Sequence, residues 1–200
     1  MPNSKVSFTS LINYFKPNRQ ANFLDRLAVV IVEYFCYEKF LDQTVEYLDF
    51  IALDYYSRNR LKWIPWFNVN LNKEINKKLS DMGWEIYPAG IYHVLRYLSK
   101  FNKPIYIMEN RVADADDNKR TVFIINHLKY VHKAISQGID VRGYFYWSLL
   151  DNFEWADGWT PKFGLYAVDR KTFKRTSRPS AKVYAEICKN NEIKRDKPCN

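Results

Sequence analysis

The 200-residue chain has little that would build a metal centre or a disulfide framework. It contains three cysteines, Cys36, Cys188 and Cys199, and their spacing matches no metal-ligand motif. An odd number of scattered cysteines predicts free thiols in a reducing compartment. The three histidines lie in segments with helical periodicity, which favours structural roles over metal ligation (His93, His127 and His132). We therefore expect neither a metal ion nor a cofactor.

The sequence also has no long apolar run and no segment with the layout of a signal peptide. Its longest apolar run covers residues 27–32 and stops at Glu33. A helix that spans a bilayer needs about 20 apolar residues. These absences predict a cytoplasmic protein with no membrane partner.

Positive charge is in excess, with a formal net charge of +9, and much of it gathers near the C-terminus (Arg170, Lys171, Lys174, Arg175, Arg178 and Lys182). Such a cluster can bind nucleic acid by neutralising phosphates. The sequence has no zinc-finger spacing, no recognisable RNA-binding signature and no heptads. The cluster is therefore interpreted as a solvated surface, and a basic nucleic-acid-binding module is the least favoured function.

The hydrophobic content of 47% and the aromatic content of 17% predict a folded globular chain. Apolar patterning indicates four strands and four helices in alternation: strands at 6–12, 48–53, 104–109 and 141–147, and helices at 21–41, 88–101, 122–137 and from 180 onward. Pro88 suits a helix start, Gly138 a helix end, and Ser180 the cap of the last helix. Residues 57–84 are expected to form a long loop.

This alternation predicts parallel strands that are joined by helical crossovers, which is an α/β fold. No linker or low-complexity break divides the sequence, so residues 1–200 are expected to form a single domain. Four βα units are half of an eight-fold barrel, whose usual length is about 250 residues.

Two of the predicted strands end in residues that suit carbohydrate chemistry. Residues 104–110 end in Glu109-Asn110, and a barrel strand delivers such a carboxylate to the mouth of an active site. Residues 143–155 end in Trp, Asp, Asn, Glu and Trp side chains, which stack on sugar rings and bridge hydroxyls. A glutamate at a strand end is a weak signal by itself, but the order of the two motifs is more specific.

Together these motifs resemble the C-terminal half of a retaining β-glycosidase of glycoside hydrolase family 1. The matching segments are residues 48–56 (sixth strand), 81–88 (the following loop), 104–110 (seventh strand), 142–155 (eighth strand and its loop), 163–169 and 178–180. The resemblance is strong from about 48 to 190 and weaker over 5–47, where residues 5–17 match the fifth strand. It implies a partial (β/α)8 TIM barrel, approximately strands 5 to 8 with their helices, as a C-terminal half-barrel.

The resemblance also implies roles for single residues. Glu109 matches the nucleophile that forms a covalent glycosyl intermediate, and Tyr56 matches the tyrosine that donates a hydrogen bond to it. The residues that match sugar-binding positions are Trp147, Glu154, Trp155, Phe163 and Asp54. Packing roles stay open for Tyr56 and Phe163, and Asp151 or Asn152 is expected to cap the turn that aims Glu154.

Four positions depart from the family pattern. Met108 replaces a threonine before the nucleophile. Arg111 replaces a glycine beside the nucleophile, and this cation can pair with Glu109 and weaken its attack. Asp54 replaces an asparagine, and Ala52 replaces a glycine. These changes are typical of either a divergent site or a remnant under relaxed constraint.

The family's general acid/base is the glutamate of a Thr-x-Asn-Glu-Pro motif on the fourth strand, and no Asn-Glu-Pro occurs here. The sequence therefore predicts a β-glycosidase, active on β-D-glucosides or related β-linked sugars, that is truncated and weak or inactive alone. The alternative is a non-catalytic carbohydrate-binding or regulatory remnant. In either case, open strand edges favour association with a complementary N-terminal half or a homo-oligomer.

Overall fold

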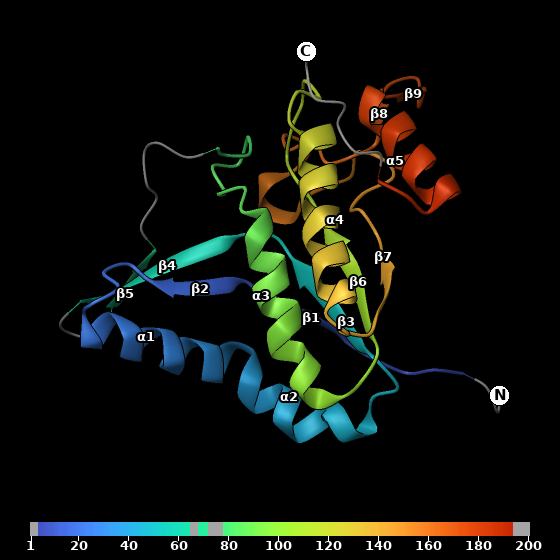
Figure 1. Cartoon of the computed structure of the whole chain (residues 1–200). Helices are drawn as coiled ribbons and strands as arrows, with labels where there is room; N and C mark the ends of the chain where they lie inside the picture. The colour runs from blue at the N-terminus through green and yellow to red at the C-terminus, as the bar shows by residue number, and fades with distance from the viewer. Residues whose placement is uncertain (1–3, 65–67, 72–77, 194–200) are drawn as a thin grey trace, which may run out of the picture.

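The computed structural model describes residues 4–64, 68–71 and 78–193 (Figure 1). Its main sheet has four strands in the order β1 (Thr9–Leu11), β3 (Ile51–Tyr55), β6 (Ile105–Asn110) and β7 (Val141–Tyr144). Each neighbouring pair is parallel. The predicted order of four parallel strands is therefore confirmed, and β1 and β7 form the two edges of the sheet.

Helices connect these strands and cover one face of the sheet (Figure 1). They are α1 (Phe23–Glu33), a π-helical segment (Tyr34–Glu38) and α2 (Lys39–Thr44) between β1 and β3, then α3 (Pro88–Leu98), α4 (Arg120–Ser136) and, after β7, α5 (Pro179–Asn190). Short 3-10 turns lie at Val45–Tyr47, Ser99–Phe101 and Trp155–Asp157. As predicted, Pro88 is the first residue of α3, and Gly138 follows α4 with a positive φ of 86°.

The two faces of the sheet differ in burial. On the helix face, Leu53 of β3 and Ile107 of β6 are 0% exposed and pack against α3 and α4. Apolar residues that are not covered by these helices remain open, with Leu11 53%, Met108 36% and Phe145 52% exposed. Among the described residues, the main core therefore lies on the helix side of this sheet, as expected for half of a barrel.

The prediction of a long loop over 57–84 is wrong for two segments. β4 (Arg58–Ile64) and β5 (Asn68–Leu71) join β2 (Tyr14–Pro17) in a second sheet of order β2-β4-β5, which projects from the main sheet (Figure 1). In the chain, β2 comes soon after β1, and β4 comes soon after β3. The pairing of β1 with β3 in the main sheet is therefore continued by the pairing of β2 with β4 in the second sheet. Long-range backbone pairing therefore forms these strands, which have no clear apolar alternation. Residues 65–67 and 72–77 of the predicted loop lie outside the described residues.

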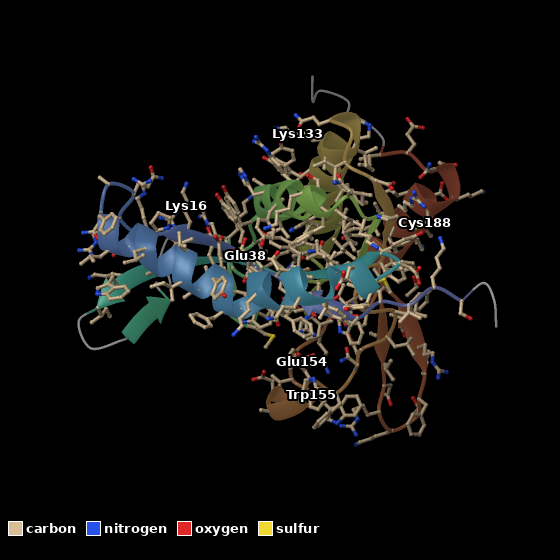
Figure 2. All side chains as sticks on the ribbon, turned by 90° about the horizontal axis from the view of Figure 1, so that it is seen from below. Lys16, Glu38, Lys133, Glu154, Trp155 and Cys188 are labelled. Carbon is tan, nitrogen blue, oxygen red and sulfur yellow. The ribbon has the colours of Figure 1, made fainter. Side chains whose placement is uncertain are left out.

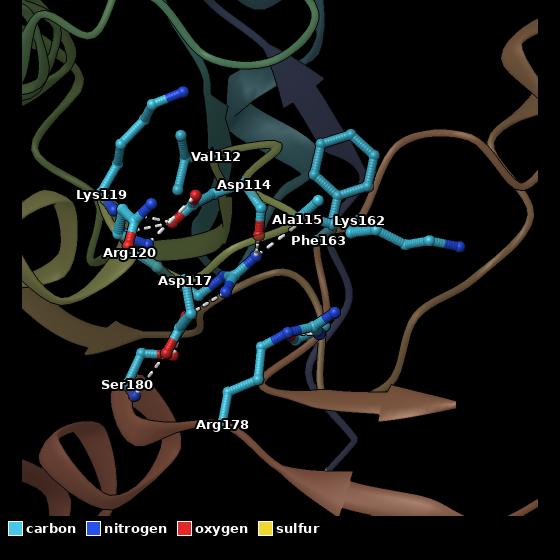
Figure 3. Close-up of polar contacts among 12 residues, drawn as sticks. Val112, Asp114, Ala115, Asp117, Lys119, Arg120, Lys162, Phe163, Arg178 and Ser180 are labelled. Atoms are coloured by element: carbon cyan, nitrogen blue, oxygen red, sulfur yellow. Dashed lines mark hydrogen bonds and ion pairs between the residues drawn. The ribbon is translucent and has the colours of Figure 1, made fainter. Parts of the chain in front are cut away.

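A buried polar network joins the loop after β6 to α5 (Figure 3). Arg120 is 0% exposed, and its guanidinium donates to the Asp117 carboxylate, to the Asp114 carbonyl at 2.6 Å and to the Lys162 carbonyl at 2.9 Å. Asp117 also accepts from the backbone N–H of Ser180 at 2.9 Å and from its hydroxyl at 2.6 Å. The N-terminus of α5 is thus capped by Asp117, and the prediction that Ser180 itself is the cap is wrong.

Two further expectations near the C-terminus are corrected. Arg178 is buried rather than solvated, and its guanidinium pairs with Asp151 at 3.0 Å. Asp151 also accepts a hydrogen bond from the Gly164 N–H at 2.9 Å. It therefore connects its own loop to the segments that contain Gly164 and Arg178, and it does not cap the turn before Glu154. The other basic residues of the cluster are exposed, with Lys182 on α5 and the rest in or near the hairpin of β8 (Tyr166–Val168) and β9 (Arg175–Ser177). Asn152 contacts Ser148 and makes no cap bond either.

Among the described ranges, none of the helices combines the length and apolar content that a bilayer-spanning helix requires. Cys36 and Cys188 are free and exposed, whereas Cys199 lies outside the described residues. The histidines lie in α3 and α4 as predicted, and His127 is fully buried with Nδ1 2.8 Å from the Phe123 carbonyl. Burial lowers the pKa of His127 to about 4, consistent with a neutral core residue.

We predict that Arg120→Met lowers the free energy of unfolding by about 3–5 kcal/mol, because it leaves Asp117 buried without its cation. Urea denaturation followed by circular dichroism measures this loss. The matched control is Arg142→Met, which removes an ion pair to Asp140 whose side chains are 48% and 51% exposed. The control should leave the midpoint nearly unchanged. Equal midpoints for the two variants would contradict a stabilising role for the network.

Candidate active site

The candidate site lies where β3 and β6 end. The register pairs Asp54 of β3 with Glu109 of β6, so the two carboxyl-bearing residues lie side by side at the carboxyl end of the sheet. Tyr56 is the residue directly after β3, and its hydroxyl donates a hydrogen bond to Oε2 of Glu109. Parallel barrels place active sites at this end of their strands. The structure therefore brings together three of the predicted site residues.

The Tyr56 hydroxyl keeps its proton and donates it in the hydrogen bond to Glu109. Burial first, and the hydrogen bond to Glu109 second, raise the pKa of Tyr56 well above its usual value. A hydroxyl that keeps its proton fixes the position of the Glu109 carboxylate in the way predicted for an orienting residue. Its ring is only partly buried, so Tyr56 is not simply a core aromatic.

Arg111 contacts a different carboxylate from the one expected. Its guanidinium forms a bidentate pair with Glu154, with Nη1 2.7 Å from Oε2 and Nη2 2.8 Å from Oε1. The suggested pair between Arg111 and Glu109 is therefore wrong. The planar fork of arginine matches both oxygens of one carboxylate, and the loop after β7 supplies Glu154 in that orientation. Arg111 is 9% exposed and Glu154 is 8% exposed, so this ion pair is buried.

Aromatic rings surround the same guanidinium. Its carbon lies 4.3 Å from the ring centroid of Phe163, 4.5 Å from that of Tyr56 and 5.6 Å from that of Trp84. Contacts of this kind between a cation and an aromatic face are favourable. A cavity of only about 10 Å³ lies behind these rings, lined by Tyr56, Trp84, Arg111 and Phe123 among others, and Glu109 does not line it. Arg111 is therefore closely packed between the aromatic rings and Glu154.

Sequence reasoning missed the contribution of Trp84 to this cluster. Its ring also lies 5.8 Å from that of Tyr56. Trp84 belongs to residues 81–88, one of the segments that carry the family resemblance, so the signal was present in the sequence. Its contact with Arg111 depends on the tertiary fold and could not be inferred from that segment.

The predicted sugar-binding residues divide into two groups. Glu154 is buried against Arg111, Phe163 is 1% exposed beneath the same guanidinium, and Trp147 is partly buried. Trp155 is 84% exposed and does not join them, although it is adjacent to Glu154 in the chain (Figure 2). The turn that begins at Trp155, with a φ of 46°, directs the two neighbouring side chains differently.

Two polar atoms of candidate residues are buried and have no hydrogen-bond partner among the described residues. They are Oδ1 of Asp54 and Nε1 of Trp147. Burial, and then the nearby charge of Glu109, raise the pKa of Asp54 to about 7, while Arg111 opposes this shift. Asp54 therefore keeps a proton on a large share of molecules at neutral pH. A carbohydrate hydroxyl can satisfy both kinds of atom, because it donates and accepts.

Within the described part of the chain, no group of three or more His, Cys, Asp or Glu side chains is arranged to hold a metal ion. The chemistry that this arrangement offers is that of carboxyl groups. Glu109 is a positioned carboxylate, and Asp54 is a carboxyl group that titrates near neutrality.

Comparison with known proteins relates this site to a family. The sequence model described as "Glycosyl hydrolase family 1" matches residues 35–193. The β-galactosidase of Sulfolobus acidocaldarius is 39% identical in an alignment of 158 positions that covers 73% of this chain and 32% of that protein. β-Glucosidase A of Thermotoga maritima is 37% identical in an alignment of 169 positions that covers 78% of this chain and 38% of that protein.

Solved structures agree over nearly the whole chain. The β-glycosidase from Pyrococcus horikoshii superposes with a TM-score of 0.89 at 39% identity, covering 96% of this chain and 50% of its own. The β-glucosidase from Thermotoga maritima in complex with glucoimidazole gives a TM-score of 0.86 at 32% identity, with coverages of 96% and 52%.

The chain therefore spans about a third of the length of these curated relatives and about half of the solved chains. The solved neighbours are (β/α)8 barrels, and the four parallel strands and helices described above form part of such a barrel. Because the family model covers most of its residues and the fold matches over nearly all of them, this chain belongs to glycosyl hydrolase family 1.

Proposed function

We propose that the chain is the nucleophile-bearing half of a retaining β-glycosidase that acts on β-D-glucosides or related β-glycosides. The observation that carries the proposal is the hydrogen bond from Tyr56 to Glu109 at the carboxyl ends of paired strands. The relatives named as β-galactosidase and β-glucosidase support the same class of substrate.

In the proposed reaction, an oxygen of Glu109 attacks the anomeric carbon, and the bond to the leaving oxygen breaks. Water then cleaves the glycosyl-enzyme and releases Glu109, so the configuration is retained. Tyr56 holds the attacking carboxylate in place. Both steps need a partner that gives a proton to the leaving oxygen and then accepts one from water. The sequence has no Asn-Glu-Pro motif to supply it, so we expect weak activity from this chain alone.

A complementary N-terminal half is the partner that best fits the exposed surfaces. The strands at the sheet edges, β1 and β7, have no further strand beside them among the described residues. A second apolar surface lies on the long helical segment before β3, where Phe23 is 72%, Val30 61% and Phe35 70% exposed. Barrel closure would pair both edges and cover the open face. Two copies of this chain are the alternative way to cover these surfaces.

A second function is favoured by one observation, the buried pair between Arg111 and Glu154. Glu154 is the carboxylate proposed to bind sugar hydroxyls, and here both of its oxygens are occupied by Arg111. The rings of Phe163, Tyr56 and Trp84 pack around the same guanidinium and hold it in place. A non-catalytic regulatory remnant would have this arrangement, and the variants described next distinguish it from an enzyme.

The first functional prediction is slow hydrolysis of an activated aryl β-glucoside by the purified chain. An activated leaving group needs little protonation, so Glu109 can react, whereas an unactivated sugar loses much of the roughly 10²–10⁴-fold that a complete acid/base typically supplies. Glu109→Gln should abolish release of the chromophore, and Glu186→Gln on the exposed surface of α5 should not. Efficient hydrolysis of cellobiose by this chain alone would contradict the proposed incompleteness of the site.

The second prediction concerns Arg111. Arg111→Gly should free Glu154 and enlarge the cavity, so that a mechanism-based fluoroglycoside labels Glu109 at least about 10-fold faster, as measured by intact mass. Arg111→Met removes the charge but keeps most of the volume. If filling of the site is what limits access, the methionine variant should label nearly as slowly as the parent.

Circular dichroism must show both variants to be folded, because each leaves Glu154 buried without its cation. Labelling of folded Arg111→Gly at the parental rate would show that Arg111 does not restrict the site.

The third prediction concerns association. Open strand edges and exposed apolar surface favour binding to another chain, so light scattering at micromolar concentration should show a dimer or a larger species. A co-expressed N-terminal half from a family member should convert it into a one-to-one complex with higher activity. A stable monomer that unfolds cooperatively, and that does not bind such a half, would contradict the proposed partner.

A further inference from the structure

We propose that Asp54 is a second catalytic carboxyl group of this site and partly replaces the absent acid/base: it gives a proton to the leaving oxygen and then accepts one from the attacking water. The inference rests on the proposed function, since it takes Glu109 as the nucleophile. It goes beyond the resemblance, because the family pattern has an asparagine here, and asparagine cannot exchange a proton in this way.

The strand register gives the geometric basis. Asp54 and Glu109 are Cα partners in neighbouring parallel strands, so their side chains leave the same face of the sheet. Neighbouring strands lie about 4.8 Å apart. Retaining glycosidases likewise hold two carboxyl groups near each other, roughly 5–5.5 Å apart, and Asp54 is close enough to Glu109 for that charge to raise its pKa. Both residues are partly exposed, on the side that the helices leave open.

None of the groups around Asp54 stabilises its charged form strongly enough to remove its proton. Oδ1 of Asp54 is buried and has no hydrogen-bond partner among the described residues. On the β6 side, the Glu109 charge opposes a second charge beside it, and Arg111 is engaged by Glu154. On the β3 side, the Tyr56 hydroxyl is used by Glu109. On the β1 side, the register partner is the apolar Leu11.

The titration of Asp54 suits this role. Its pKa is raised to about 7, mainly by burial and then by Glu109. General acids and bases work best when their pKa lies near the working pH. Below pH 7 Asp54 is mostly the acid that the first step needs. In the second step Glu109 is bonded to the sugar and uncharged, so the pKa of Asp54 falls and the base form that this step needs is favoured.

The proton balance then closes within this chain. In the first step Glu109 bonds to the anomeric carbon, the glycosidic bond breaks, and the proton of Asp54 moves to the departing oxygen. In the second step Asp54 takes a proton from water, the oxygen of that water bonds to the anomeric carbon, and the bond to Glu109 breaks. Both carboxyl groups return to their starting protonation states.

The test uses the whole chain and the variant Asp54→Asn, which keeps the shape of the side chain and removes the acid. A 2-fluoroglycosyl fluoride labels Glu109, and intact mass spectrometry follows loss of the label from pH 5 to 9, with and without azide. In the parent, release should speed up as pH rises through the pKa of Asp54, which lies below 7 in the labelled enzyme because Glu109 is then bonded to the sugar and uncharged. In Asp54→Asn it should be at least about 100-fold slower and nearly independent of pH. Azide, which needs no base, should restore release as the β-glycosyl azide.

Asp140→Asn is the matched control, since it makes the same chemical change at an exposed position before β7. It should behave as the parent does. Parental release rates and an unchanged pH profile in Asp54→Asn would overturn the role of Asp54 and leave Glu109 as nucleophile. Failure of the parent to become labelled at all would overturn the proposed function and this inference together.

A second measurement does not depend on turnover. Carbon NMR of the labelled aspartate carboxyls should show Asp54, assigned from its loss in Asp54→Asn, titrating near pH 7. In Glu109→Gln this midpoint should move to lower pH, because the neighbouring negative charge is gone. A midpoint near 4 in the parent, or one that does not move in Glu109→Gln, would overturn the carboxyl pair.

Discussion

The pairing of β3 with β6 is the interaction on which the rest of this site depends. Leu53 and Ile107 are register partners, and both are fully buried against the helices. Side chains alternate along a strand, and a bulge after Leu53 sets the next pair, so Asp54 and Glu109 meet on the open face. The hydrophobic core thus determines which carboxyl groups meet, although none of its atoms takes part in the chemistry.

Arg111 and Glu154 form a buried ion pair that the family resemblance did not predict. A buried ion pair adds little stability compared with well-packed apolar residues, but losing one partner is costly because a charge remains buried. The side chains come from different loops, and Phe163, Tyr56 and Trp84 pack around them. Replacing Arg111 alone therefore changes the charge of Glu154's surroundings as well as the volume of the cavity, and the two effects need separate variants.

The sequence allowed prediction of the structural features that depend on residues close together in the chain. The four parallel strands, the start of α3 at Pro88 and the end of α4 before Gly138 follow from apolar periodicity and from backbone preferences. The meeting of Tyr56 and Glu109 followed from family motifs. By contrast, β4 and β5 form through partners elsewhere in the chain. The partners of Arg111 and Ser180 lie 43 and 63 residues away, and only the tertiary fold selects them.

The half-barrel has a physical asymmetry that bears on its chemistry. Its helix face is an apolar core, in which side chains of β3 and β6 pack against α3 and α4. Its other face holds the carboxyl groups, and there the environment depends on whatever covers it. Burial is the largest cause of the raised pKa of Asp54. Further covering of this face by a partner would remove more water from Asp54 and would raise its pKa further, unless the partner brings a positive charge. The protonation of Asp54 would therefore depend on whether a partner covers this face.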